Sequence, residues 1–400
     1  MLPRVKIFFE NGLLGTASSS SDGLVGLACT AVAVSETFEL AKAYVIRTLS
    51  GLEELGITSA DDDANAFLYK QVKDFYSIAE DGTALWIMGF PNTALQSDIV
   101  DKTQDYAKLL IQEAQGALKG LFVAFKPANG YTPVIEDSLD KDLKTAMLNA
   151  QLLAEWSTTD LFAPLFIALE ARHFDGDVAD LLTLTTYEYN RVGVLLGDTV
   201  SASTGAAIGL LAGKVASIPV QRHIGRVRDG ALPITAAYVK DLSVAKADVE
   251  SIHDKGFITF RNFTGKAGYY FSDDCLATKE TDDYRSLARR RTIDKAYRIG
   301  YSTLLEELNE EVPITAEGKL SPSLVKSWES SVETAIINEM TANGNLGADP
   351  SDPSDTGVTC YINSNQNVVS TSRIEVILRV KPYGYAKYID VKLGFKTTNS

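Results

Sequence analysis

The stretch ALWIMGF, residues 84–90, is an unbroken apolar run with the length of a buried strand. Three further apolar runs follow it: GLFVAFKP at 120–127, APLFIALEAR at 163–172 and RVGVLLGD at 191–198. Helical patterns alternate with these runs, around 97–117, 137–156 and 203–219. Strands that alternate with helices are joined by βαβ crossovers, so the sequence predicts a mainly parallel sheet covered on both faces. We expect this α/β domain over about residues 60–235.

The segment before this domain begins with a strand pattern on a tether rich in Gly and Ser. In the stretch RVKIFFE, Val5, Ile7 and Phe9 fall on one face of a strand. The run NGLLGTASSSSDG that follows is flexible and packs little. A tethered strand suits a chain that lends a strand to a neighbouring sheet. We expect an N-terminal strand arm and tether over 1–20, and a β-rich opening segment with the α/β domain over 21–235.

The pattern changes after residue 235 and predicts an α+β domain over 236–400. Strand-like pieces precede two long helices, one over about 281–311 and one that begins at Ser321. Two alternating runs, SRIEVILRV and KYIDVKLGF, then close the chain, and the turn residues between them favour a hairpin. The apolar residues on one face of these runs are Ile374, Val376, Leu378 and Val380, and Ile389, Val391, Leu393 and Phe395.

The composition is that of an ordinary globular protein, with 45% hydrophobic and 22% charged residues. The net charge of -14 opposes binding to nucleic acid and to anionic membranes. Cys29, Cys275 and Cys360 form no CxxC pair, so we expect no disulfide framework and a reducing compartment. No apolar stretch has the length of a membrane span or the pattern of a signal peptide. We expect a soluble protein that is made and kept in the cytosol.

The sequence carries no motif for catalysis or cofactor binding. The stretch STGAAIGLLAGKV resembles a phosphate-binding loop, but three residues instead of four separate Gly209 from Gly213, and a valine takes the hydroxyl position. We interpret these glycines as a close contact between helices. GxGxxG and GxSxG motifs are missing, and His173, His223 and His253 each stand alone. We expect no catalytic residue, no cofactor and no metal, while a triad of residues distant in sequence remains open.

Two acidic clusters are interpreted as ordinary solvated segments. DDD at 61–63 precedes a helix, whose N-terminus favours negative charge, and a metal site is the alternative. DPSDPSD at 349–355 lacks the spacing and central glycine of an EF-hand, so a polar loop is expected, with a weak calcium site as the alternative.

The segment YRSLARRRTIDKAYR, residues 284–298, is strongly basic in an acidic protein. Its charges spread over most of a helix circumference, whereas a surface that binds DNA forms a narrower stripe. The acidic stretch EELNEE follows at 306–311. Opposite charges on one surface favour head-to-tail association of identical copies. A solvated helix face and nucleic-acid binding are the alternatives. The basic residues are Arg285, Arg289, Arg290, Arg291, Lys295 and Arg298.

The order of these segments resembles the contractile tail sheath proteins of bacteriophages and of related contractile injection machines. The similar segments are AYVIRTLSGLEELGI at 43–57, NAFLYKQVKDFYSIAEDGTALWIMGF at 65–90, GLLAGKVASIPVQRHIG at 209–225, KGFITFRNFTGKAGYYFSDDCLAT at 255–278, the arginine helix, and INSNQNVVSTSRIEVILRVKPYGYAKYIDVKLGF at 362–395. The long α/β insertions and the DPSDPSD loop depart from the family pattern.

The resemblance implies strand exchange between subunits. The fold class is then α/β plus α+β, with a C-terminal sheath-core domain completed by exchanged terminal strands. Val5, Ile7 and Phe9 would form the donated strand. The expected interface residues also include the accepting hairpin and the arginine helix: Ile374, Val376, Leu378, Ile389, Val391, Leu393, Arg289, Arg290 and Arg291.

The resemblance also implies a structural function without catalysis. The expected assembly is a stack of hexameric rings around an inner tail tube protein, with baseplate and tail terminator proteins as further partners and no nucleic acid or membrane. Contraction would drive the tube through a target envelope. The expected location is the virion tail, assembled in the bacterial host cytoplasm. A cytosolic α/β enzyme or nucleotide-binding protein is the alternative.

Overall fold

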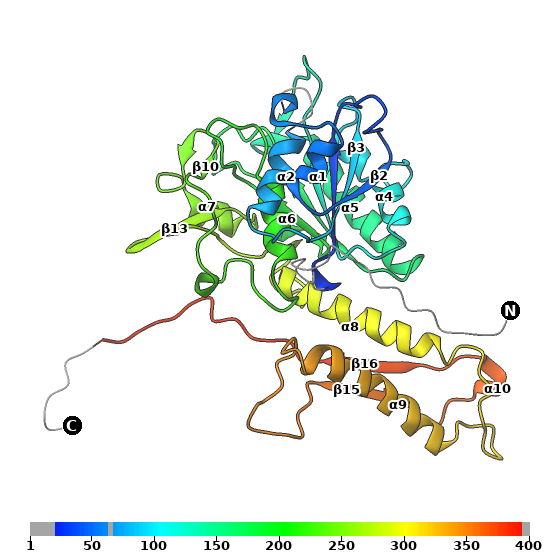
Figure 1. The fold of residues 1–400 in the computed structure, drawn as a ribbon. Coiled ribbons are helices and arrows are strands. Elements are labelled where there is room, and N and C mark those ends of the chain that lie inside the picture. The colour runs from blue at the N-terminus through cyan, green and yellow to red at the C-terminus, as the bar shows by residue number, and fades with distance from the viewer. Residues whose placement is uncertain (1–20, 63–66, 394–400) are drawn as a thin grey trace, which may run out of the picture. The chain divides into compact units, whose positions relative to one another are not determined.

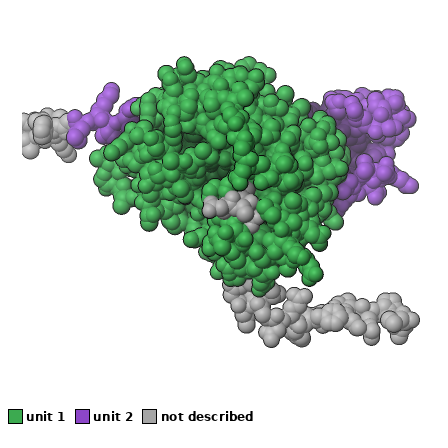
Figure 2. Space-filling model, turned by 90° about the horizontal axis from the view of Figure 1, so that it is seen from above, with its two compact units in different colours: residues 1–302 green, residues 303–400 purple. Residues whose placement is uncertain are grey.

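The computed structural model describes residues 21–62 and 67–393. The chain forms two compact units, Met1–Ser302 and Thr303–Ser400 (Figure 2). The expected N-terminal strand with Val5, Ile7 and Phe9 lies outside the described residues. None of the described helices has the length and apolar character needed to cross a bilayer.

A six-stranded sheet forms the centre of the first unit (Figure 1). Its strand order is β2-β3-β1-β4-β7-β9, and every neighbouring pair is parallel except β2 and β3. The predicted fold class, α/β with a mainly parallel sheet, is confirmed. The run that begins at Val25, which we expected in the opening segment, is the central strand. The bounds are β1 Val25–Thr30, β2 Ala43–Ile46, β3 Leu85–Phe90, β4 Gly120–Ala124, β7 Phe166–Glu170 and β9 Val192–Leu195.

Successive strand residues face two separate hydrophobic cores. Leu27 and Phe122 join the core on one face, while their neighbours Ala28 and Val123 join the core on the other. A strand covered on both faces needs apolar residues at every position, which explains the unbroken runs. The helices on the first face are α1 Leu49–Glu54, α2 Leu68–Tyr76 and α6 Ile208–Ala216, and those on the second are α3 Gln96–Ile99, α4 Ala107–Glu113 and α5 Asp142–Thr159.

Helices α2 and α6 approach each other at the two glycines of the pseudo-phosphate loop. A Cβ on Gly209 would lie 1.9 Å from the main-chain oxygen of Gln71, and one on Gly213 would lie 2.5 Å from that of Phe75. The Gln71 side chain also accepts from Gly209 N at 2.6 Å and donates to Ala206 O at 3.1 Å. The interpretation of these glycines as a close helix contact is confirmed.

Residues 236–302 pack within the first unit. The domain limits expected from the sequence, 1–20, 21–235 and 236–400, stay a prediction. The edge of the large sheet at β9 is extended by Ile258, which forms a parallel bridge with Leu195. The elements of 236–302 are β10 Tyr238–Val239, β11 Leu242–Ser243, α7 Val249–Asp254, β12 Phe260–Phe263, β13 Lys266–Phe271, β14 Ala277–Thr278 and α8 Leu287–Leu305, whose last residues enter the second unit.

Short elements complete the first unit. The two-stranded pairs are β5–β6, β8–β14, β10–β11 and β12–β13, all antiparallel. The remaining bounds are η1 Ser21–Gly23, η2 Ser59–Asp61, β5 Ile135–Glu136, β6 Leu139–Asp140, η3 Leu184–Thr186, β8 Glu188–Tyr189 and η4 Val227–Asp229.

The second unit is an α+β arrangement around a two-stranded antiparallel sheet. Strand β15, Val358–Ile362, pairs with β16, Val376–Val380. Helix α9, Pro322–Ile336, covers one face of the sheet, and Val325, Trp328 and Ile362 lie in the shared core. The other elements are η5, a π-helical turn over Ile337–Thr341, and α10 Val368–Thr371.

The expected closing hairpin is wrong in its pairing. The first run does form a strand, β16, but its partner is β15 and not the run that begins at residue 387. The described residues 381–393 hold no strand. Alternation along a run predicts a strand but does not identify its partner. The run VTCYI at 358–362 has three buried alternating residues, and one of them, Ile362, lies in the core that α9 covers.

Replacing Gly209 with alanine should destabilise the first unit by about 3 kcal/mol or more, because the new methyl group meets main-chain atoms that cannot move aside alone. Chemical denaturation of the full chain measures the change. Gly51→Ala in α1 is the matched control: its Cβ would have only ordinary contacts, and alanine favours a helix. Equal stability of the two variants would contradict the close contact.

Candidate functional site

The carboxyl edge of the parallel sheet is the usual ligand site of an α/β fold. In the order β3-β1-β4, the chain runs from β1 to β3 on one side and then crosses from β3 to β4 on the other side of β1, and ligands bind outside such a switch point. Here Thr30 at the end of β1 bridges to the chain after β4: its Oγ1 accepts from Lys126 N at 2.8 Å and donates to Lys126 O at 3.2 Å. A threonine therefore occupies the position where a crevice would open.

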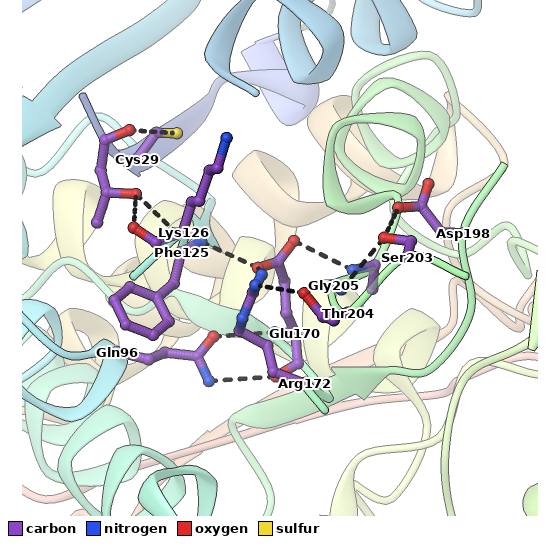
Figure 3. Close-up of polar contacts among 12 residues, drawn as sticks. Cys29, Gln96, Phe125, Lys126, Glu170, Arg172, Asp198, Ser203, Thr204 and Gly205 are labelled. Atoms are coloured by element: carbon purple, nitrogen blue, oxygen red, sulfur yellow. Dashed lines mark hydrogen bonds and ion pairs between the residues drawn. The ribbon is translucent and has the colours of Figure 1, made fainter. Parts of the chain in front are cut away.

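Glu170 at the end of β7 is the centre of a buried polar network (Figure 3). Its Oε2 accepts from Phe125 N at 2.9 Å and from Arg172 Nη1 at 3.0 Å, and its Oε1 accepts from Ala206 N at 3.3 Å. Gln96 Nε2 donates to Glu170 O, and Gln96 Oε1 accepts from Glu170 N, both at 3.2 Å. Burial raises the pKa of Glu170 above its ordinary value, against the opposing effect of Arg172. The carboxylate thus joins β4, β7 and the segment before α6.

A second polar group at this edge surrounds Asp198. Its carboxylate accepts from Lys70 Nζ at 2.8 Å and from Ser203 Oγ at 2.6 Å. Lys70 also pairs with Asp74 at 2.9 Å, and the two carboxylates outweigh burial and raise its pKa. A hollow between Asp198, Ser203 and Lys240 has room for about one water molecule. The carboxylates of Glu170 and Asp198 are bonded to neighbouring donors, so they give no support to the alternative of an α/β enzyme.

The basic segment 284–298 lies at the opposite, amino edge of the sheet. Arg298 Nη1 donates to Gly116 O at 2.7 Å, and its Nη2 donates to Leu118 O and Pro164 O, both at 2.7 Å. These carbonyls precede β4 and β7. Lys295 binds Asp22, just before β1, at 2.7 Å. Helix α8 therefore connects the loops that lead into successive strands.

The buried arginines of α8 are also used inside the first unit. Arg291 Nη2 donates to Val215 O at 3.1 Å and to Ile218 O at 3.0 Å, at the carboxyl end of α6 where positive charge is favourable. Arg290 binds Asp294 at 2.6 Å, and Asp294 also binds Arg191 at 3.2 Å. The expected interface role of these arginines stays a prediction. Arg289 is partly exposed, whereas Arg290 and Arg291 are buried.

The sheet of the second unit has two different edges. Glu333 Oε1 accepts from Cys360 N, and Glu329 Oε1 from Ile362 N, both at 2.8 Å. These main-chain groups point away from β16, so carboxylates of α9 close the outer edge of β15. Within the described residues, β16 has one strand neighbour, β15, and its other edge carries no strand. The predicted interface residues Ile374, Val376 and Leu378 are half-buried beside or within β16.

The acidic loop 349–355 is held by its own turns. Asp349 and Asp352 each accept from the serine two residues later. Asp355 binds Lys381 at 2.6 Å, and this ion pair lowers the pKa of Asp355 to about 2. The arrangement is that of a solvated loop and does not favour the calcium alternative.

Sequence reasoning missed the Glu170 network and the inward direction of the arginines. The available signals were the charged Glu170 and Arg172 at the end of an apolar strand, and charges spread around a whole helix. A charged residue at a buried position implies a partner, but that partner cannot be located from sequence spacing.

Glu170→Ala should reduce the free energy of unfolding by about 3–5 kcal/mol, because it leaves the Arg172 charge and two main-chain donors buried without their acceptor. Denaturant titration measures the loss. Glu188→Ala removes an exposed partner of Lys279 and should leave stability nearly unchanged. A Glu170→Ala protein as stable as the control would show that this network is not needed.

Arg298→Met keeps an unbranched apolar stem but removes every donor. The substitution should lower the free energy of unfolding by about 3 kcal/mol or more, because each buried carbonyl left without a donor costs roughly 1–3 kcal/mol. Hydrogen exchange should show the loss around β4 and β7. Arg285→Met, near the start of α8 and partly exposed, is the control. Unchanged protection in Arg298→Met would contradict the role of α8 at the amino edge.

Both halves of the chain match models of a single family. The model described as "DUF2586, N-terminal domain" matches residues 2–275, and the model described as "DUF2586, C-terminal domain" matches residues 283–400. No curated protein sequence matches the chain.

Solved structures of similar fold come from contractile systems. One chain of the anti-feeding prophage (AFP) helical sheath in the contracted state is 14% identical, with 99% of each chain covered and a TM-score of 0.60. A chain of an extracellular contractile injection system, the PVC sheath complex in the contracted state, is 15% identical, with 99% of this chain and 98% of that chain covered and a TM-score of 0.60. A chain of the AFP baseplate in the contracted state is 14% identical, with complete coverage of both chains and a TM-score of 0.64.

These likenesses span the whole chain and confirm, at the level of the fold, the resemblance to contractile sheath proteins. The chain belongs to the DUF2586 family and has the fold found in the sheaths of contractile systems.

Proposed function

We propose that this protein is a structural subunit of a contractile tail sheath or of the sheath of a related contractile injection system. It polymerises as stacked hexameric rings around an inner tail tube, and the contraction of the polymer drives the tube through a target envelope. The likeness in fold to chains of two contracted-state sheath complexes, over nearly the full length of each chain, supports this proposal.

The observation that carries the proposal is the segment 387–393. Ile389 and Val391 are each 77% exposed and Leu393 is 96% exposed, although they alternate with Asp390 and Lys392 as in a half-buried strand. An exposed strand-like segment with an apolar face is unfavourable in water and is suited to adding itself to another sheet. We propose that it is a donated strand, rather than part of an accepting hairpin.

The free edge of β16 is the accepting edge in this proposal. The carboxylates of Glu329 and Glu333 already occupy the outward main-chain donors of β15, so a further strand there would have to displace them. Among the described residues no strand lies on the outer edge of β16, so a strand can be added there without displacing one. Ile374, Val376 and Leu378 extend along this edge, and each added strand creates a new edge for the next. The arm with Val5, Ile7 and Phe9 can therefore join the same sheet as the C-terminal strand.

Other partners follow from the same assembly. An inner tail tube protein lies inside the rings, and baseplate and tail terminator proteins close the two ends. The likeness to a chain of the AFP baseplate in the contracted state supports a place near the baseplate. We propose no catalytic role, because the polar groups at the carboxyl edge of the sheet bind one another. Assembly takes place in the bacterial host cytoplasm, and the product is the tail of a virion or of an injection particle.

The test is electron microscopy of the full chain, alone and with a co-expressed inner tube protein, beside two variants. Val391→Asp with Leu393→Lys keeps the net charge but removes the apolar face, and should abolish rings and tubes. Asp390→Lys with Lys392→Asp changes the opposite face and should assemble normally. All four positions are exposed, so each chain should melt at the same temperature. Normal polymers from the first variant would overturn strand donation, and a wild-type chain that never polymerises would overturn the sheath proposal.

A further inference from the structure

Two of the three histidines, which the sequence shows as isolated residues, meet at one buried carboxylate in the first unit. His223 follows α6, His253 lies on α7, and Asp273 follows β13; α7 and β13 are neighbours in Figure 1. His223 Nε2 lies 2.7 Å from Asp273 Oδ1, and His253 Nε2 lies 3.0 Å from Asp273 Oδ2. The thiol of Cys275 completes a group: it, His253 and Asp273 offer a sulfur, a nitrogen and an oxygen that all lie within 4.8 Å of one another.

The hydrogen bonds around this group give its two imidazoles different roles. Gly225 N donates to His223 Nδ1 at 3.0 Å, so in the neutral ring the proton is on Nε2, which donates to Asp273 Oδ1. His253 Nδ1 lies 3.1 Å from Asp254 Oδ1. Hydrogen bonds to Asp273 and Asp254 raise the pKa of His253, and in the protonated ring both nitrogens donate. When the Nε2 proton leaves, Nε2 can bind an ion while Nδ1–H still faces the Asp254 carboxylate.

This arrangement is the one that supports a ligating histidine. In metal sites, the nitrogen that does not bind the ion donates to a carboxylate or carbonyl, which fixes the tautomer and the direction of the ring. Asp254 takes that position for His253. His223 does the same for Asp273, because it holds Oδ1 and leaves Oδ2 directed at the group. Each potential oxygen or nitrogen ligand therefore has its own orienting partner.

The charge of the site also favours a cation. Asp254, Asp273 and Asp274 bring three carboxylates to two imidazoles. Asp274 binds the start of α8, because its Oδ2 accepts from Ser286 Oγ at 2.6 Å and from Ala288 N at 3.0 Å. The negative charge of Asp273, whose side chain is 7% exposed, is met by His223 and His253. Hydrogen bonds to Asp273 and Asp274 outweigh burial and raise the pKa of His223 to about 9. A divalent ion would offset this charge where a hydrogen bond does so only in part.

We propose that His253, Asp273 and Cys275 form a binding site for a zinc-class transition-metal ion, oriented by Asp254 and His223. A mixed set of imidazole, carboxylate and thiolate is the ligand chemistry of Zn²⁺, whereas Ca²⁺ and Mg²⁺ require oxygen ligands. Bond lengths of about 2.0 Å to N or O and about 2.3 Å to S place ligand atoms roughly 3.3–3.5 Å apart. His253 Nε2 and Asp273 Oδ2, at 3.0 Å, would move slightly apart, while the distances to Cys275 Sγ are at most 4.8 Å and would shorten where they exceed this range. The fourth position of the tetrahedron is left for water or another ligand.

The ion would fasten three separate segments. It would tie α7 to the end of β13, and Asp274 would carry that link to the first turn of α8. His253 and Cys275 are both partly exposed, so an ion can reach the site from solvent. The role is structural and is independent of the sheath proposal, because all of these residues lie within one unit of one chain.

Cobalt is the probe for this site, because Co²⁺ binds zinc ligands and reports them in its spectrum. The full chain is freed of metal with a chelator under reducing conditions and titrated with Co²⁺. We expect saturation at one ion per chain, tetrahedral d–d bands, and a near-ultraviolet band from thiolate-to-cobalt charge transfer. Added Zn²⁺ should displace the cobalt and raise the melting temperature in a concentration-dependent way. A wild-type chain that shows no saturable cobalt binding would overturn the proposal and leave a hydrogen-bonded network.

Variants assign the ligands. Cys275→Ser should remove the charge-transfer band, and His253→Gln should abolish tight binding. Asp254→Ala, which touches only the orienting partner, should weaken binding by about 10- to 100-fold and keep the spectrum. Cys360→Ser, in the other unit, is the matched control for the thiol and should behave as wild type. Circular dichroism confirms that each variant is folded, and an unchanged cobalt spectrum in folded Cys275→Ser would overturn the assignment.

Discussion

The first unit depends on how the carbonyl groups at the amino edge of its parallel sheet find donors. Loops that lead into parallel strands leave main-chain oxygens outside the ladder, and a buried oxygen without a donor is costly. Arg298 supplies donors to the loops before β4 and β7, and Arg291 supplies them to the end of α6. A guanidinium suits this task because it carries five N–H donors in a fixed plane and never loses its charge at ordinary pH.

The same interaction explains why an acidic protein concentrates positive charge in one helix. A basic segment at the surface would serve a partner, but Arg290 and Arg291 are buried and act on their own chain. The negative charges that they meet are partial charges on carbonyls and the carboxylate of Asp294. Helix α8 is therefore a structural part of the α/β unit, although 91 residues, 196–286, separate it from β9 in the sequence.

The sheet could be predicted because strands covered on both faces leave an unmistakable apolar run, as at 84–90 and 120–127. The pairing of strands could not be predicted, because the alternating pattern of β16 fits the run that begins at residue 387 as well as it fits β15, its actual partner. Polar networks are harder still. Gln96 meets Glu170, and His223 meets Asp273, across sequence separations of 74 and 50 residues, and nothing in the local pattern links them.

The edges of the two sheets differ in whether their polar groups have partners within the chain. At the carboxyl edge of the large sheet, Glu170 and Asp198 bind neighbouring donors, and at the amino edge α8 supplies them. In the small sheet, Glu329 closes the edge of β15. Among the described residues, β16 and the exposed segment 387–393 are left with backbone groups and apolar side chains that a further strand would satisfy together. One added strand would remove both costs, and the proposed exchange of strands between copies would supply it.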